Sequence, residues 1–157
     1  MKATVAGLQV LRRFREGRAE RDLAAQRRAL EQACQTLARV EEGMRNAQAR
    51  VDAADAALQQ ALLGGRLSSG HYLHACEEIQ ALREAVMLEA GARASALSAV
   101  AACRQDRDLA QQLFVQRQRQ LEALQPWLAH EARRERMARD SYEESLTEER
   151  RPRGGVR

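Results

Sequence analysis

The sequence predicts an all-α protein, a long antiparallel two-helix coiled-coil hairpin with a C-terminal helical overhang. Alanine, arginine and leucine are the commonest of its 157 residues, which is typical of coiled coils and long helices. Only two prolines, Pro126 and Pro152, occur, so long segments contain no residue that stops a helix. One segment also repeats large side chains every seven residues, the spacing of a coiled coil. Together these observations exclude a sheet protein.

The seven-residue repeat defines a first helix, expected over about residues 4–63. Position a of the repeat carries large residues and position d carries mostly alanine. The series are Leu23, Leu30, Leu37, Met44, Val51 and Leu58 at a, and Gln26, Ala33, Val40, Ala47, Ala54 and Ala61 at d. Small residues at d let a partner helix approach closely, so we expect one inward seam along this helix.

Upstream of Leu23 the repeat meets polar residues. The positions that would continue it hold Gln9 and Glu16, whereas the apolar residues form a shifted stripe of Val5, Leu8 and Leu11. An insertion in a heptad pattern changes the helix face that carries the seam. A stutter is therefore expected near residues 12–20.

A turn is expected over residues 64–69. Gly64 and Gly65 follow Leu63 and can adopt the positive φ of a helix C-terminal cap. Ser68 or Ser69 can then accept hydrogen bonds from the first free N–H groups of the next helix. So short a turn makes the second helix fold back antiparallel to the first. If Leu62 and Gly70 face each other across the turn, the numbers of any two facing residues sum to about 132.

The second helix is expected over about residues 70–148, with a kink near Pro126, followed by a frayed tail at 149–157. Proline removes a backbone donor and clashes with the preceding turn. The expected inward stripe is Tyr72, Cys76, Ile79, Leu82 or Arg83, Val86, Ala90, Leu97, Val100 or Ala101, Leu109, Leu113, Gln120 or Leu121, Leu124 and Leu128. The whole chain, residues 1–157, is interpreted as a single coiled-coil stalk.

Composition also bears on location. No apolar run approaches the roughly 20 residues of a membrane span, and the N-terminal residues lack the apolar core of a signal peptide. The three cysteines, Cys34, Cys76 and Cys103, have unrelated spacings typical of reduced thiols. We expect a cytoplasmic protein with no direct membrane insertion.

A thin hairpin offers no enclosed pocket, so we expect no enzyme activity, no catalytic residue and no cofactor. His71 and His74 stand three residues apart near Cys76 and could hold a metal at one edge. Polar residues beside a turn explain them better, and we expect no metal site.

Positive charge is concentrated at the N-terminus, where residues 1–28 carry eight basic and three acidic side chains. An arginine-rich helix can bind an acidic protein surface, bind nucleic-acid phosphates, or remain a solvated face. Glu16, Glu20 and Asp22 interrupt the arginines, which favours protein docking. The expected overhang also carries apolar residues without a partner in the hairpin, Trp127, Met137, Tyr142 and Leu146, which indicates a protein partner or self-association.

Several segments resemble the FliJ/YscO (SctO) family, the central-stalk proteins of type III secretion and flagellar export. The run Leu8 to Arg21 resembles the arginine-rich N-termini of YscO-type proteins, and Ile79 to Val86 resembles the start of FliJ's second helix. The charged segment Arg139 to Glu143 and the antiparallel layout also agree. The resemblance covers nearly the whole chain.

The resemblance implies a virulence or flagellar stalk at the cytoplasmic face of the inner-membrane secretion apparatus. Such proteins resemble the rotary ATPase gamma subunit, and they bind the export ATPase, the export-gate membrane protein and secretion chaperones, with no nucleic acid expected. The implied ATPase contacts are Arg12, Arg13, Arg15, Arg18, Arg133, Arg134 and Arg136. The implied gate contacts are Leu82 and Ala85, although Glu78 replaces an aromatic residue of that face. A basic coiled coil that binds nucleic acid, a holdase-like chaperone and a purely structural coil stay open as alternatives.

Overall fold

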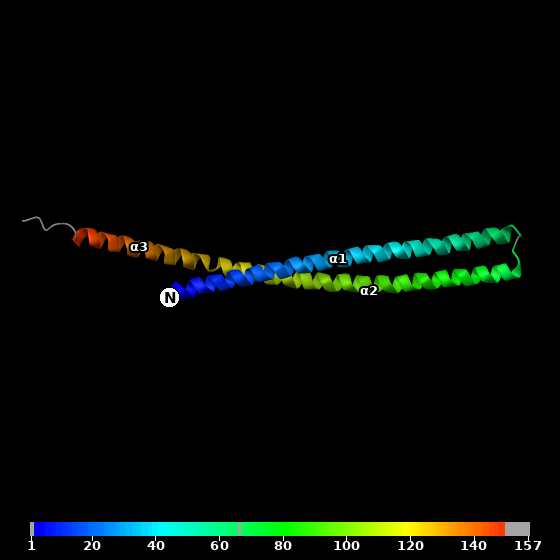
Figure 1. Ribbon diagram of the computed structural model, residues 1–157, viewed down its shortest axis with the longest axis horizontal. Coiled ribbons are helices and arrows are strands. Elements are labelled where there is room, and N and C mark those ends of the chain that lie inside the picture. The colour runs from blue at the N-terminus through cyan, green and yellow to red at the C-terminus, as the bar shows by residue number, and fades with distance from the viewer. Residues whose placement is uncertain (1, 66, 150–157) are drawn as a thin grey trace, which may run out of the picture. The chain divides into compact units, whose positions relative to one another are not determined.

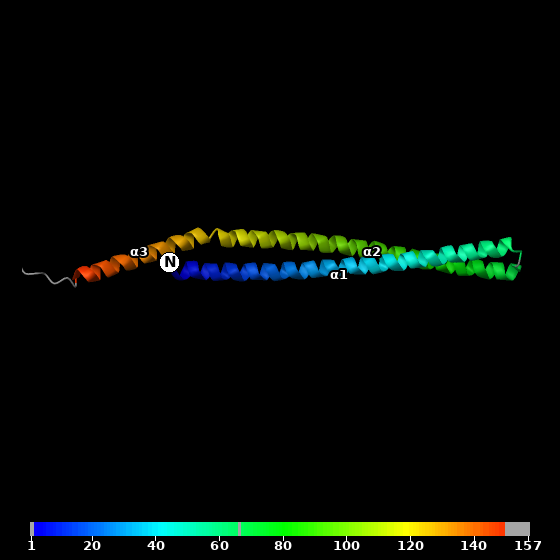
Figure 2. The same cartoon turned by 90° about the horizontal axis from the view of Figure 1, so that it is seen from above.

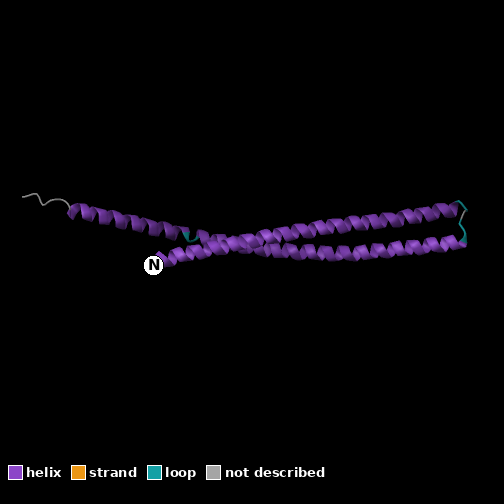
Figure 3. Ribbon diagram, viewed as in Figure 1, coloured by secondary structure: helices purple, strands orange, loops and turns teal. Residues whose placement is uncertain are grey.

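The computed structural model describes residues 2–65 and 67–149, which form three helices and contain no strand. Helix α1 spans Lys2–Leu63, α2 spans Ser69–Glu122 and α3 spans Gln125–Glu149 (Figures 1 and 3). The chain divides into two compact units. We call Asp22–Ala110 the central unit, and Met1–Arg21 with Gln111–Arg157 the terminal unit. The expected frayed tail lies, from residue 150 onward, outside the described residues.

In the central unit α1 and α2 lie side by side (Figures 1 and 2). Asp55 of α1 pairs with Arg83 of α2 at 3.1 Å, and Glu41 pairs with Arg93 at 3.1 Å. A Cβ atom built on Gly43 would lie 3.3 Å from the Glu89 carboxylate. Partner numbers on α2 therefore fall as those on α1 rise. The sum near 132 expected from the sequence is met by the Gly43–Glu89 approach, and it rises to 134 for Glu41–Arg93 and to 138 for Asp55–Arg83, which lies nearer the turn.

The predicted seam of α1 is confirmed by burial in the central unit. All twelve residues of the two predicted series, from Leu23 to Ala61, are buried or half-buried. Leu23, Ala47 and Val51 are the most enclosed of them, each below 5% exposed. Because a two-helix layer covers only one side of each helix, most other residues of this segment remain exposed.

The seam of α2 differs from the predicted stripe. Buried and half-buried residues recur every four and three positions, and this series is Ala75, Ile79, Leu82, Val86, Glu89, Arg93, Ala96, Val100, Cys103, Arg107 and Ala110. Leu97 and Leu109, predicted to face inward, are exposed, as are Tyr72 and, in the terminal unit, Leu113. The constant heptad spacing opposite α1 decides which positions turn inward, even where they are alanine, cysteine or charged.

The turn between α1 and α2 follows the predicted chemistry. Gly65 has a φ of 63°, and the N–H groups of Gly64 and Gly65 donate to the carbonyls of Gln60 and Leu62. Such bonds satisfy carbonyls that the helix end leaves free. The hydroxyl of Ser68 accepts a bond from the backbone N–H of His71 at 3.4 Å, as an N-cap side chain does.

In the terminal unit the α1 seam continues without the stutter that the sequence predicts. Gln9, Arg12, Glu16 and Ala19 are the buried or half-buried residues at three- and four-residue spacing, in register with Leu23. The apolar Leu8 and Leu11 are exposed instead. Long polar side chains can cover apolar surface with their stems while their ends reach water or a partner, so polar seam positions need not shift the register.

The predicted second helix is two helices in the structure. A break at Ala123 and Leu124 separates α2 from α3, where the N–H of Leu124 bonds to the Leu121 carbonyl three residues back. Pro126 is the second residue of α3. In the first turn of a helix the N–H that proline lacks has no intrahelical acceptor, so Pro126 starts a helix rather than bending one.

Candidate protein-docking surfaces

The four N-terminal arginines implied as ATPase contacts divide into two groups. Arg13, Arg15 and Arg18 are exposed, whereas Arg12 is half-buried at a seam position. The Arg12 guanidinium donates to the backbone carbonyl of Gln120 in α2. Arg12 therefore joins α1 to α2 within the terminal unit, and the other three remain available to bind a partner. We call Arg13, Arg15 and Arg18 the arginine cluster.

Phe14 lies within the arginine cluster and is also largely exposed. It occupies the outward position of the heptad, opposite the seam residues Arg12 and Glu16. An aromatic ring between guanidinium groups provides apolar contact beside bidentate donors for carboxylates or phosphates. This combination suits a partner surface that carries both acidic and apolar side chains.

The implied contacts on α3, Arg133, Arg134 and Arg136, are all exposed. Trp127, Met137 and Tyr142 are also exposed, each by about two thirds of its surface. The structure therefore places these apolar residues in solvent, as the sequence predicts for the C-terminal helix.

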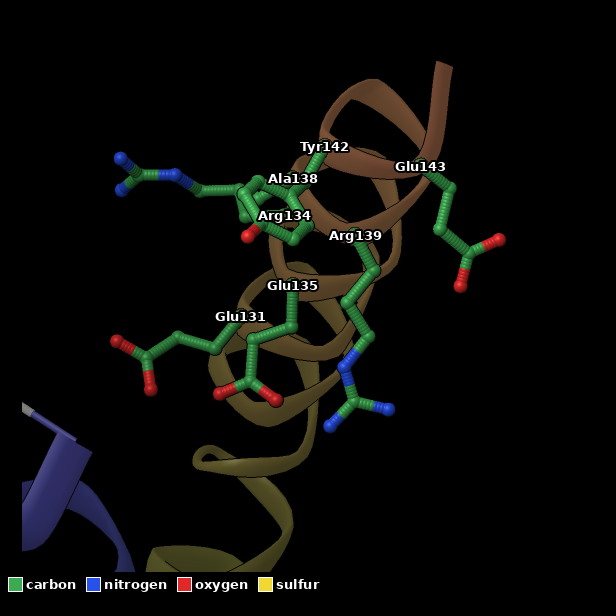
Figure 4. Close-up of a pocket in the computed structure, with 7 residues that line it drawn as sticks. All are labelled: Glu131, Arg134, Glu135, Ala138, Arg139, Tyr142 and Glu143. Carbon is green, nitrogen blue, oxygen red and sulfur yellow. The ribbon is translucent and has the colours of Figure 1, made fainter. Parts of the chain in front are cut away.

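A shallow hollow on α3 is lined by residues of that helix alone, and these are Glu131, Arg134, Glu135, Ala138, Arg139, Tyr142 and Glu143 (Figure 4). Glu131 and Glu135 continue the seam spacing of α2 and are half-buried, while Ala138 and Tyr142 continue it and are exposed. Because one helix supplies every wall, the hollow is an open surface. It suits a helix or loop of a partner better than a small molecule, which prefers concave pockets.

The implied gate residues Leu82 and Ala85 are half-buried in the central unit. Leu82 is a seam residue, so much of its side chain is directed to α1 rather than to solvent. The exposed large residues nearby are Met87 and Leu88, at 73% and 78% exposure. Reasoning from the sequence missed this pair, which an unbroken heptad count along α2 could have found.

The polar residues at the start of α2 form local pairs. The Ser68 hydroxyl lies 2.6 Å from Nδ1 of His71, and Nε2 of His74 lies 3.4 Å from Glu78. A side-chain hydrogen bond with Cys76 raises the pKa of Tyr72 above its ordinary value. Among the described residues, no three His, Cys, Asp or Glu side chains gather as a metal site would require.

Within the described residues, the segment Ser69–Thr147 contains an 18-residue window with a mean hydropathy of 1.3, and 11% of the window is buried. By length and composition it could cross a membrane. A single window of this kind is weak evidence for a membrane span. The apolar character of the window comes from the alanine-rich middle of α2.

Comparison with known proteins identifies no relative. No family model matches the chain, and neither a curated protein nor a solved structure is significantly similar to it.

Proposed function

We propose that the chain is a stalk protein of type III secretion, which binds the export ATPase ring through its terminal unit and links that ring to the export gate. Secretion chaperones are further partners under this proposal, and the protein acts at the cytoplasmic face of the inner membrane without catalysing a reaction. The observation that carries it is the arginine cluster, which is exposed around Phe14 in the same unit as the apolar residues of α3.

The proposal includes a finer description of the fold, an antiparallel coiled-coil hairpin whose last helix extends beyond its partner. The falling partner numbers of the Glu41–Arg93 and Asp55–Arg83 pairs support the antiparallel direction. Spin labels at Leu30 and Ala102, two positions whose numbers sum to 132, should then report a short intramolecular distance in dilute solution. A separation comparable to the roughly 60 Å length of a 40-residue helix would refute the hairpin.

Docking at the terminal unit follows from charge and geometry. Guanidinium groups bind carboxylates bidentately, which fixes orientation as well as providing attraction. Trp127, Met137 and Tyr142 add apolar area, and large aromatic residues often carry much of the energy of protein interfaces. Arg133, Arg134 and Arg136 extend the positive surface along α3. An acidic partner surface with apolar pockets would match both features.

The gate contact is proposed at Leu82 and Ala85. Both residues are half-buried, so a partner would reach only their exposed edges while α1 and α2 stay packed. Conservative enlargement of Ala85 to Val should weaken gate binding while leaving ATPase binding intact, because the two sites lie in different units. Equal loss of both would indicate a folding defect.

Charge reversal tests ATPase binding. The test variant replaces the arginine cluster with glutamate and keeps Arg12, which donates to the Gln120 carbonyl within the terminal unit. A matched control reverses three exposed arginines of α1 in the central unit, Arg39, Arg45 and Arg50, so the change in net charge is equal. The test variant should lose ATPase binding and secretion, and the control should keep both.

Circular dichroism and hydrodynamic size of both variants should equal those of the unchanged protein, because Arg and Glu have similar helix propensities. Normal ATPase binding by the cluster variant at physiological salt would refute the assignment. Loss of binding by both variants would show that net charge alone attracts the ATPase, which also contradicts a specific contact at the terminal unit.

The exposed Phe14 between Arg13 and Arg15 favours one alternative, nucleic-acid binding, because an aromatic ring can stack on a base. Such binding would weaken steeply with salt, since it releases counterions from the phosphates. Binding to single-stranded DNA that survives physiological salt and is lost in Phe14→Ala would favour this function over the stalk.

A further inference from the structure

The middle of α2 places its charges inward and its uncharged residues outward. Between positions 85 and 103 the only charged residues are Glu89 and Arg93. Both occupy seam positions and are half-buried, and Arg93 pairs with Glu41. A solvated helix normally presents charged residues on its outer side. The outer side of α2 is therefore depleted in the groups that usually keep a helix in water.

The residues of this outer side are all exposed, and they are Met87, Leu88, Gly91, Ala94, Ser95, Ser98, Ala101 and Ala102. We call them the uncharged face. A Cβ built on Gly91 would meet no atom within 4 Å, so nothing in the described chain covers the middle of the face. Large exposed apolar patches are uncommon on monomeric proteins and indicate interaction sites, and most residues of this face are apolar.

We propose that a second copy of this chain covers the uncharged face, with the two α2 helices antiparallel about a two-fold axis between Ala94 and Ser95. This pairing places Met87 beside Ala102 of the other copy and Leu88 beside Ala101. Each large side chain then meets a small one. At the centre, Gly91 faces Ser98, and small residues there let the helices approach closely. The proposal does not depend on the type III secretion assignment.

The residues that flank the face match under the same two-fold axis. Leu109, exposed at 64%, falls within one position of Ala81, so a small residue again lies near a large one. Glu84 falls within one position of Arg104, and the symmetry makes this ion pair twice. Both side chains are exposed. A parallel pairing would instead place Glu84 against Glu84 and Met87 against Met87, so charge complementarity favours the antiparallel arrangement.

The size of the face sets the expected affinity. From Ala81 to Leu109 it runs about 42 Å along a helix about 10 Å wide, or about 420 Å² per copy. The total, roughly 850 Å², is less than the 1,200 Å² or more of stable complexes. The dimer should therefore be weak and in exchange with monomer, with a dissociation constant on the order of micromolar or weaker.

Sedimentation equilibrium over a wide range of protein concentration tests the dimer. The unchanged chain should pass from monomer to dimer, whereas Ala94→Lys, which sets two like charges beside the two-fold axis, should stay monomeric. The matched control is Ala49→Lys, because Ala49 is an exposed alanine on the outer side of α1 in the same unit. The control should dimerise as the unchanged chain does. A purely monomeric unchanged chain would overturn the proposal, and so would an Ala94→Lys variant that still dimerises.

Cysteine cross-linking tests the direction. In a background that replaces Cys34, Cys76 and Cys103 with alanine, Ser95→Cys should form a disulfide-linked dimer on mild oxidation. Ala102→Cys should not, because its neighbour in the antiparallel pair is Met87. Efficient cross-linking at both positions would indicate a parallel pair and overturn the geometry.

The remaining occupant to test is a lipid surface, because α2 contains the window of membrane-like hydropathy. Phosphatidylcholine vesicles provide the probe. A chain that stays monomeric in solution and floats with vesicles, and that loses flotation in Ala94→Lys, would assign the uncharged face to a membrane. That result would overturn the dimer. Dimerisation without flotation supports it.

Discussion

Replacing Leu23 or Leu109 by alanine provides a direct test of which residues form the core of the central unit. The chemical change is identical at the two positions, and both residues lie in that unit. Leu23 is 4% exposed and Leu109 is 64% exposed. The truncation removes three carbons, or about 2.4 kcal/mol of transfer free energy when fully buried. Scaled by the buried fraction, it should cost about 2.3 kcal/mol at Leu23 and about 0.9 kcal/mol at Leu109.

The cavity contribution should be small at both sites, because water reaches the edge of a two-helix layer and the helices can move together. Urea unfolding followed by circular dichroism measures the difference, and the protein should be dilute so that self-association does not contribute. Equal losses of unfolding free energy would refute the seam described above. A larger loss at Leu109 would favour the inward stripe that the sequence predicts.

Further predictions concern the glycines and local opening. Gly91→Ala should raise the unfolding free energy by about 1 kcal/mol, since alanine favours the helix and the added carbon meets nothing. Gly43→Ala should gain less, because the Glu89 carboxylate must move. In a Glu89→Ala background the gain from Gly43→Ala should rise to that of Gly91→Ala. Equal gains from the two single changes would contradict this account. Amide exchange should be faster at residues 9–19 than at residues 44–58, because Gln9, Arg12 and Glu16 replace apolar seam residues in the terminal unit. Equal protection of the two segments would show that the polar seam packs as tightly as the apolar one.

For the arginine cluster, the sequence identified the region, and burial distinguished its members. Composition and spacing indicate a basic N-terminal segment that is followed by an uninterrupted heptad series from Leu23 to Ala61. They do not show that Arg12 lies at a seam position and bonds to Gln120, because that depends on how α1 meets the end of α2. The same limit applies to Leu82, whose apolar character predicts a contact without showing whether it is with α1 or with a partner.

The sequence by itself determined the helical class, the α1 seam from Leu23 to Ala61 and the end of α1 at the Gly64–Gly65 pair. These features depend on residue spacing and on backbone conformations that few residues adopt, so a short segment of sequence is enough to predict each of them. Tertiary structure decided which side of α2 turns inward. The regular spacing of contacts with α1 places Glu89 and Arg93 on the seam and leaves Leu109 in solvent, against the order of their hydrophobicities. The tertiary structure also decided that the break comes at Ala123 and Leu124, before Pro126. Proline disrupts a helix interior but is tolerated in the first turn of a helix.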